Sequence, residues 1–192
     1  MMQYILVVIS AVLINNIVLT RFLGVCPFLG VSNRLTTAGG MSGAVLFVLT
    51  MATVVTYLIN QYVLVPLGIG FLKTIMYILV IAALVQMVEI VLKKISPPLY
   101  QALGVYLPLI TTNCAILGVS ILVVQKGFDL LTSTVFALAN ALGFGLALMI
   151  FAGLREQLDL VDVPKGMQGV PIALVMAGLL SLAFMGFSGM VR

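Results

Sequence analysis

Long stretches without a charged residue constrain the fold of this chain more than any other feature of its sequence. Four of them lie between consecutive charged residues: Arg34 to Lys73, Lys94 to Lys126, Asp129 to Arg155, and Lys165 to Arg192. Each is longer than the roughly 20 residues that a helix needs to cross a bilayer. Only 7% of the 192 residues are charged and 63% are hydrophobic, whereas about a quarter of a soluble domain is charged. The sequence therefore predicts an all-α integral membrane protein.

Six transmembrane helices are expected, separated by residues that break helices, such as Pro66 and the pair Pro97-Pro98. The first segment lacks the basic start and the small-residue cleavage pattern of a signal peptide, so it is expected to stay as a helix. The predicted spans are residues 3–22, 39–63, 71–92, 99–124, 130–153 and 168–190.

Basic residues in the loops predict the orientation of these helices. The loops after odd-numbered spans contain Arg34, Lys93, Lys94, Arg155 and Lys165. The even-numbered spans are followed by Lys73, Lys126 and Arg192. Because cytoplasmic loops carry the excess of Lys and Arg, we expect the odd-numbered loops in the cytoplasm and both termini outside a bacterial cytoplasmic membrane. The basic residues form no patch, so they are expected to attract anionic lipid rather than nucleic acid.

An internal repeat divides the chain. Residues Cys26–Ser32 and Cys114–Ser120 share the pattern C-x-x-L-G-V-S and contain the only two cysteines. We expect a single membrane domain, 1–192, made of a three-helix repeat at 1–96 and a second one at 97–192. An odd number of crossings inverts the second repeat relative to the first. The two cysteines should then approach each other near the middle of the membrane.

The helices that carry the two motifs are expected to be interrupted. Gly24 and Pro27 flank Cys26, and Pro108 with Thr111-Thr112-Asn113 precedes Cys114, so continuous helical hydrogen bonding is unfavourable at both places. Interrupted helices turn free amide groups and helix ends towards the membrane interior, where they stabilise negative charge.

Three interpretations of the cysteines are open: packing as small apolar residues, a disulfide, or a metal or redox site. Packing gives no reason for cysteine at both matched positions, so the repeat favours a metal or redox site. The chain has no histidine, which leaves thiolates as the characteristic ligands. A [2Fe–2S] cluster normally needs four cysteines. A second, homologous polypeptide with its own pair would therefore complete a cluster held by Cys26 and Cys114.

Several polar residues are further candidates for the site. Gly24, Val25 and Asn113 adjoin the cysteines and could donate amide hydrogen bonds to cluster sulfurs. Arg21 could offset cluster charge or extend to the cytoplasmic interface. Glu89 is a candidate for an ion path, or an ion-pair partner of Lys93 one turn later. Four polar residues could contact a cation, hydrogen-bond the cluster sulfurs or cap interrupted helices: Asn15, Asn16, Thr112 and Asn113.

Three segments resemble the A subunits of Rnf complexes: Leu23–Ser32, Leu107–Val119 and Ala177–Gly189. The resemblance also includes Asn15-Asn16 and the run Asp162-Val-Pro164. The homologous E subunit of the sodium-pumping NADH:quinone reductase is the nearest alternative, but the Cys-Pro-Phe-Leu-Gly form at Cys26 is closer to the Rnf type.

The resemblance implies a role in a larger complex. Rnf complexes pass electrons between reduced ferredoxin and NAD and couple this to movement of Na⁺ or H⁺ across the membrane. It also implies that Cys26 and Cys114 share a [2Fe–2S] cluster with a homologous E subunit of opposite orientation. The B, C, D and G subunits would hold the flavins, the other clusters and the NADH and ferredoxin sites. This chain has no Gly-rich nucleotide loop, so we expect it to bind no flavin or nicotinamide and to have no catalytic activity alone.

Two other classes of function stay open from the sequence. Inverted repeats with interrupted helices also describe secondary transporters, whose substrate sites lie between the repeats. In a transporter, or in a purely structural membrane anchor, the cysteines would be incidental.

Overall fold

The structure is a computed structural model that describes residues 2–68, 70–95, 107–161, 164 and 166–188. All regular elements in these ranges are helical, as predicted. They are α1 (Met2–Ile9), the π-helix η1 (Ser10–Ile14), α2 (Val25–Gly30), α3 (Leu35–Ile59), the π-helix η2 (Asn60–Leu64), α4 (Val65–Leu67), the 3₁₀-helix η3 (Gly70–Leu72), α5 (Lys73–Ile95), α7 (Leu107–Thr111), α8 (Cys114–Gln125), α9 (Leu130–Leu158) and α10 (Val170–Ser188).

Helices long and apolar enough to cross a membrane confirm a multi-pass membrane protein. Four such segments are described, and two shorter apolar helices lie within the first and sixth predicted spans. The long segments are Leu35–Leu64, Gly70–Val91, Pro108–Gln125 and Leu130–Leu158, and the shorter helices are Ile5–Ile14 and Val170–Gly186. Several parts of the prediction lie outside the described residues. They are the repeat boundary at 96/97, Pro97-Pro98, the start of the fourth span at 99–106, Asp162 and Val163, Lys165, the end of the sixth span at 189–190, and Arg192.

The first span is not the continuous helix predicted for residues 3–22. Helical structure ends at Ile14 and resumes at Val25. The two asparagines explain the break, because short polar side chains compete with helical hydrogen bonding. The Asn15 side chain donates to Ser10 Oγ (3.1 Å), and Asn16 Oδ1 accepts from the Val18 amide (3.1 Å).

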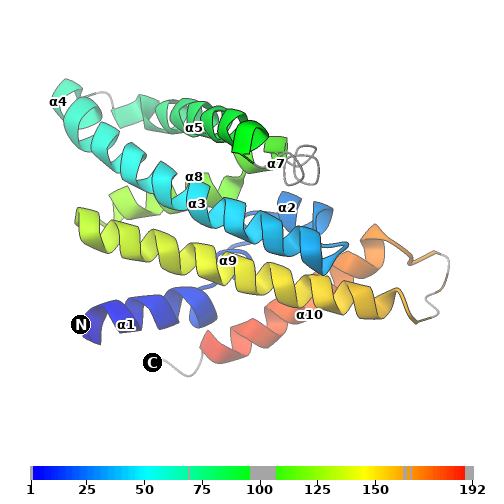
Figure 1. Cartoon of the computed structure of the whole chain (residues 1–192). Helices are drawn as coiled ribbons and strands as arrows, with labels where there is room; N and C mark the ends of the chain where they lie inside the picture. Colours follow the sequence, from blue (N-terminus) through cyan, green and yellow to red (C-terminus); the bar gives the residue numbers. More distant parts are fainter. Residues whose placement is uncertain (1, 69, 96–106, 162–163, 165, 189–192) are drawn as a thin grey trace.

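Helix α9 is the centre of the bundle. Two thirds of its most apolar stretch (67%) is buried, against 17% for the peripheral α5. Its most extensive contact is with α3, which runs beside it in the opposite direction (Figure 1). Small residues allow this close approach, since a Cβ on Gly145 would lie 3.2 Å from Ser42 Cβ.

The π-helix η1 and Asn16, which follows it in the break, pack against α9 at Gly143. The Asn16 side chain is fully buried and donates to Gly143 O (2.7 Å) and Val12 O (3.2 Å). A glycine at position 143 lets the η1 backbone approach, because a Cβ there would lie 3.1 Å from Ala11 O. The contact makes Asn16 a structural link between the first helix break and the central helix.

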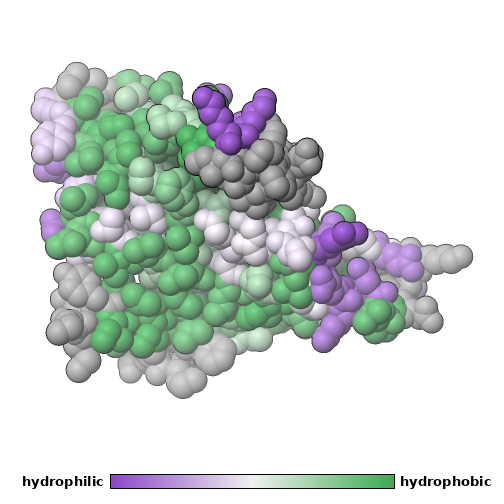
Figure 2. Space-filling view, in the orientation of Figure 1, coloured by the Kyte–Doolittle hydropathy of each residue, from purple (hydrophilic) through white to green (hydrophobic). Residues whose placement is uncertain are grey.

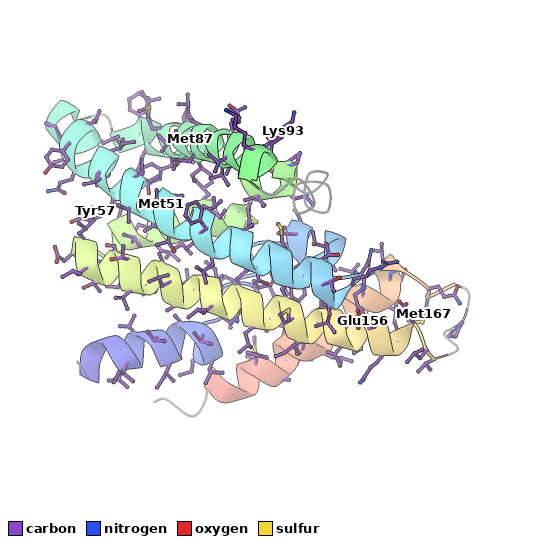
Figure 3. The ribbon with its side chains drawn as sticks, viewed as in Figure 1. Met51, Tyr57, Met87, Lys93, Glu156 and Met167 are labelled. Carbon is purple, nitrogen blue, oxygen red and sulfur yellow. The ribbon has the colours of Figure 1, made fainter. Side chains whose placement is uncertain are left out.

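The surface separates apolar and polar regions as expected in a bilayer. Hydrophobic residues cover most of the face in Figure 2, and hydrophilic residues gather towards the end where α3 begins and α9 ends. Lys93 and Glu156 lie towards this end, whereas Tyr57 lies towards the other (Figure 3). Between α3 and α5, Met51 and Met87 line an apolar cavity of about 600 Å³. This cavity offers no polar chemistry.

Gly143→Val is expected to destabilise the protein, because the new side chain would meet the η1 main chain at Ala11 O and Val12 Cα, 3.1 and 3.2 Å from an added Cβ. Overpacking of this kind typically costs ~1–3 kcal/mol. Gly153→Val is the matched control on the same helix, since nothing lies within 4 Å of a Cβ at that position. Thermal unfolding in detergent should give a lower midpoint for G143V than for G153V. Equal midpoints would contradict the packing of η1 on α9.

Candidate functional site

Both cysteines lie at the start of a helix that follows a break in the chain. Cys26 is the second residue of α2, after Gly24 in the left-handed region (φ +85°). Cys114 is the first residue of α8, after the extended Asn113 (φ −70°, ψ 111°). The predicted interruptions at the two motifs are therefore confirmed. The first break also holds Phe22 in the left-handed region (φ 54°), a conformation that costs a non-glycine residue about 1–2 kcal/mol.

A hydrogen bond joins the two cysteine segments. The Gly24 amide donates to Cys114 Sγ over 2.9 Å. Gly24 is separated from Cys26 by a single residue, the half-buried Val25. The first motif and the second cysteine, far apart in the sequence, therefore meet at this point. Amide hydrogen bonds of this kind stabilise negative charge on a sulfur ligand.

Glycine is the residue that fits at position 24. A Cβ there would lie 2.9 Å from Phe144 Cε2, 3.2 Å from Ala115 Cβ and 3.3 Å from Asn113 Oδ1. The positive φ adds a second reason, because a side chain disfavours the left-handed conformation. Gly24 thus allows the chain before Cys26 to lie directly against the start of α8.

Asn113 caps α8 and has an unused donor beside Cys114. Its Oδ1 accepts from the Ala115 amide (2.9 Å), which fixes the orientation of the side-chain amide. Among the described residues, its buried Nδ2 has no hydrogen-bond partner. A buried donor without an acceptor costs about 1–3 kcal/mol. This atom is therefore a donor available to an acceptor beyond the described residues.

The glycines of the two motifs pack in a reciprocal way. A Cβ on Gly118 would lie 2.8 Å from Leu23 Cδ1, and one on Gly30 would lie 3.5 Å from Leu109 Cδ1. Each glycine therefore faces a leucine from the segment that precedes the other cysteine. The valine and serine that follow each glycine are buried in both motifs.

The Cys26 helix is held on α9 by an aromatic stack and an arginine. The rings of Phe28 and Phe151 are stacked with centroids 4.2 Å apart. Arg155 donates to Leu29 O and to Ser32 Oγ, each over 2.8 Å. The sequence assigned Arg155 to loop charge alone and missed this role, since the bonded residues are more than 120 positions away and no local pattern links them.

The accessibility of the two thiols bears on their interpretation. Both cysteines are free, so the structure contains no disulfide between them. Cys26 is exposed and Cys114 is half-buried. Exposure also argues against a packing role for Cys26. No group of three or more His, Cys, Asp or Glu side chains suited to a metal gathers in the described ranges. A metal held by these cysteines would therefore take further ligands from elsewhere.

Other candidate residues lie apart from the cysteines. Arg21 lines a cavity together with Lys126, the residue that follows α8 at the end opposite Cys114. Arg21 therefore lies away from the end of the bundle that carries Arg34 and Arg155. The interpretation in which Arg21 extends to the same interface as those two residues does not fit this position. Glu89 and Lys93 lie one turn apart on α5, the spacing of the predicted ion pair.

The polar residues at the helix breaks form local hydrogen bonds. Thr112 Oγ1 donates to Pro108 O (2.9 Å), and the bonds of Asn15 and Asn16 described above also stay near helix ends or join α9. This pattern favours the capping interpretation of the three side chains over contact with a cation.

Comparison with known proteins identifies a family. A family model described as "Rnf-Nqr subunit, membrane protein" matches residues 4–191. The A subunit of the Na(+)-translocating ferredoxin:NAD(+) oxidoreductase complex of Acetobacterium woodii is 54% identical over 189 residues, 98% of each chain. The A subunit of the ion-translocating oxidoreductase complex of Pseudoalteromonas translucida is 54% identical over 192 residues, 100% of each chain. The equivalent subunit of Syntrophotalea carbinolica is 56% identical over 191 residues, 100% of this chain and 99% of that one.

Gly24→Ala is expected to destabilise the site more than Gly127→Ala. Both glycines have positive φ, +85° and +61°, so both substitutions carry the left-handed penalty of ~1–2 kcal/mol. A Cβ at Gly127 meets nothing within 4 Å, whereas one at Gly24 displaces Phe144. Thermal unfolding in detergent should therefore give the lower midpoint for G24A. If G127A unfolds at the same or a lower temperature, the close approach at Gly24 is wrong.

Proposed function

Because the chain belongs to the Rnf-Nqr family of membrane subunits, we propose that it is the A subunit of an ion-translocating ferredoxin:NAD oxidoreductase complex. The relative from Acetobacterium woodii is named as the A subunit of a ferredoxin:NAD(+) oxidoreductase complex, and the other two are named as A subunits of ion-translocating oxidoreductase complexes. The activity belongs to the complex, a redox-driven translocase, and not to this chain alone. The coupling ion is Na⁺ or H⁺; Na⁺ is named for the relative from Acetobacterium woodii.

Cys26 and Cys114 are the proposed ligands of a [2Fe–2S] cluster. The observation that carries this assignment is the Gly24 amide bonded to Cys114 Sγ, which joins the two segments and adds a donor to a sulfur. Both cysteines are free of a disulfide and can therefore lose a proton to become the thiolates that ligate iron. When bound, such a cluster carries one electron at a time through the membrane interior.

A homologous E subunit is the proposed source of the other two ligands. Four cysteines hold a [2Fe–2S] cluster, and this chain contains two. The exposed Cys26 is accessible to a second chain. Asn113 Nδ2, buried and without a partner among the described residues, is a donor for an acceptor beyond them. The B, C, D and G subunits would complete the complex.

Inverted repeats, 1–96 and 97–192, are the proposed architecture around the cluster. Gly30 and Gly118 hold equivalent places in the two motifs, and each packs against the segment before the other cysteine, at Leu109 and at Leu23 respectively. A two-fold relation brings equivalent segments together in this way. In the proposed orientation, Arg34 and Arg155 lie on the cytoplasmic side and both termini lie outside.

The residues of this chain would set the electrostatics of the cluster. Amide hydrogen bonds to the sulfurs favour the more negative, reduced state and so raise the reduction potential. The Gly24 amide already has this geometry towards Cys114. Arg155 fixes α2, and with it the Cys26 thiol, relative to α9.

Cys26→Ser and Cys114→Ser are each expected to abolish the EPR signal of the intramembrane cluster and ferredoxin:NAD electron transfer in the purified complex. The matched control is Ser120→Ala, which removes the hydrogen bond from Ser120 to Ile116 O but no sulfur, and the signal should persist. If both cysteine variants keep every iron-dependent signal and electron transfer but lose ion uptake, the chain is a transporter without a redox centre. If they change nothing, a structural anchor is the better account.

Reporter fusions test the orientation. Alkaline phosphatase fused after residue 188, near the end of α10, should be active because the enzyme folds outside the cytoplasm. The same reporter fused after Lys94, at the end of α5, should be inactive because this loop is expected in the cytoplasm. The opposite pair of activities would invert the proposed topology, and equal activities would contradict the helix count between the two points.

A further inference from the structure

A cavity of about 410 Å³ lies between η1, the first helix break, α8 and the start of α9. Five polar side chains line it together with an apolar wall that includes Leu6 and Leu122. The polar lining residues are Ser10, Asn15, Arg21, Lys126 and Asn140. No local sequence pattern indicates this cavity, because its lining comes from four separate segments.

The charges that face the cavity are positive. Arg21 and Lys126 are its ionic residues, and no carboxylate is among its described lining residues. Lys126 Nζ lies over the rings of Phe128 and Phe136, 5.4 and 5.1 Å from their centroids. Two cations around one cavity repel each other unless an anion lies between them. The lining therefore selects against a cation and for an anion.

Neutral donors add to the two charges. Ser10 Oγ accepts from Asn15 Nδ2 (3.1 Å), so its own hydroxyl proton remains for a ligand. Asn140 Nδ2 donates to Phe136 O (2.8 Å) and has a second proton. Hydroxyl and amide donors beside Arg and Lys are the groups that hold phosphate oxygens.

The positive-inside rule, the usual explanation for basic residues at helix ends, does not explain the two cations of this cavity. Lys126 precedes α9, whereas Arg155 lies in the last turn of that 29-residue helix. In the proposed orientation, Arg21 and Lys126 thus lie towards the outer side, where loop cations are depleted. The orientation of the helices therefore does not explain why Arg21 and Lys126 are basic, whereas a bound anion does.

We infer that this cavity binds a phosphate group, and that an anionic phospholipid supplies it. Basic pockets between transmembrane helices bind lipid headgroups, and Leu6, which is 62% exposed on α1, gives an acyl chain an apolar surface at the cavity wall. The phosphate would link Arg21, five residues before Cys26, to Lys126 at the end of the helix that begins with Cys114. This second connection between the cysteine segments does not depend on the proposed cluster.

Photo-crosslinking of the intact complex tests the inference. The delipidated complex is incubated with photoactivatable phosphatidylglycerol or phosphatidylcholine, with or without excess inorganic phosphate, and labelled peptides are mapped by mass spectrometry. Phosphatidylglycerol should label the peptides that contain Leu6 and Leu122 several-fold more than phosphatidylcholine. Lys126→Gln should lower this labelling about fivefold, the factor that corresponds to ~1 kcal/mol per basic residue at a membrane surface, and Lys126→Arg should restore it.

Lys73→Gln is the matched control, since Lys73 starts α5 at the same end of the bundle but does not line the cavity. It should leave the labelling unchanged. Loss of the phosphatidylglycerol label on addition of inorganic phosphate would identify free phosphate as the source of the same chemistry. Equal labelling by both lipids in the wild-type complex would overturn the inference. So would a carbodiimide crosslink from Lys126 to an acidic residue of another subunit, which would place a carboxylate in the cavity.

Discussion

The hydrogen bond from the Gly24 amide to Cys114 Sγ connects two helix breaks that would each be unfavourable alone. A backbone group without a partner in a bilayer costs several kcal/mol, so an interrupted membrane helix needs partners from elsewhere in the protein. Two backbone groups of the first break find such partners: Cys114 Sγ accepts from the Gly24 amide, and Ser181 of α10 donates to Leu19 O (2.6 Å). The Asn16 side chain also anchors the break to α9 through its bond to Gly143 O. The breaks are therefore part of the packing.

Helix α9 holds this arrangement in place, because residues along one of its sides contact η1, Gly24 and three residues of the first motif. Gly143 admits η1, Phe144 lies against Gly24, Phe151 stacks on Phe28, and Arg155 holds the end of α2. The spacing from Phe144 to Phe151 and on to Arg155 is seven and then four residues, which keeps the three on one helix face. The central helix thus fixes Gly24 beside Cys114, and with it the geometry that the proposed cluster requires.

The sequence predicted the parts of the site that depend on local chemistry. Long uncharged runs indicated the helices, and proline, glycine and polar residues beside Cys26 and Cys114 indicated the breaks. It did not predict that the first helix ends at Ile14, because the tertiary bond from Asn16 to α9 stabilises the break. Arg155 was interpreted as loop charge, and Arg21 was not placed beside Lys126. Both positions depend on contacts between segments far apart in the chain, which no local pattern contains.

This chain is proposed to supply half of the ligands of a cluster site. Counting iron in the purified protein tests this proposal most directly. Iron and acid-labile sulfide can be counted in this chain purified alone and in a co-purified pair with its proposed homologous partner. We expect two irons and two sulfides per pair, and no stoichiometric iron in the chain alone, because two thiolates do not complete a [2Fe–2S] site. A pair without iron, or a full cluster in the isolated chain, would contradict the proposed sharing.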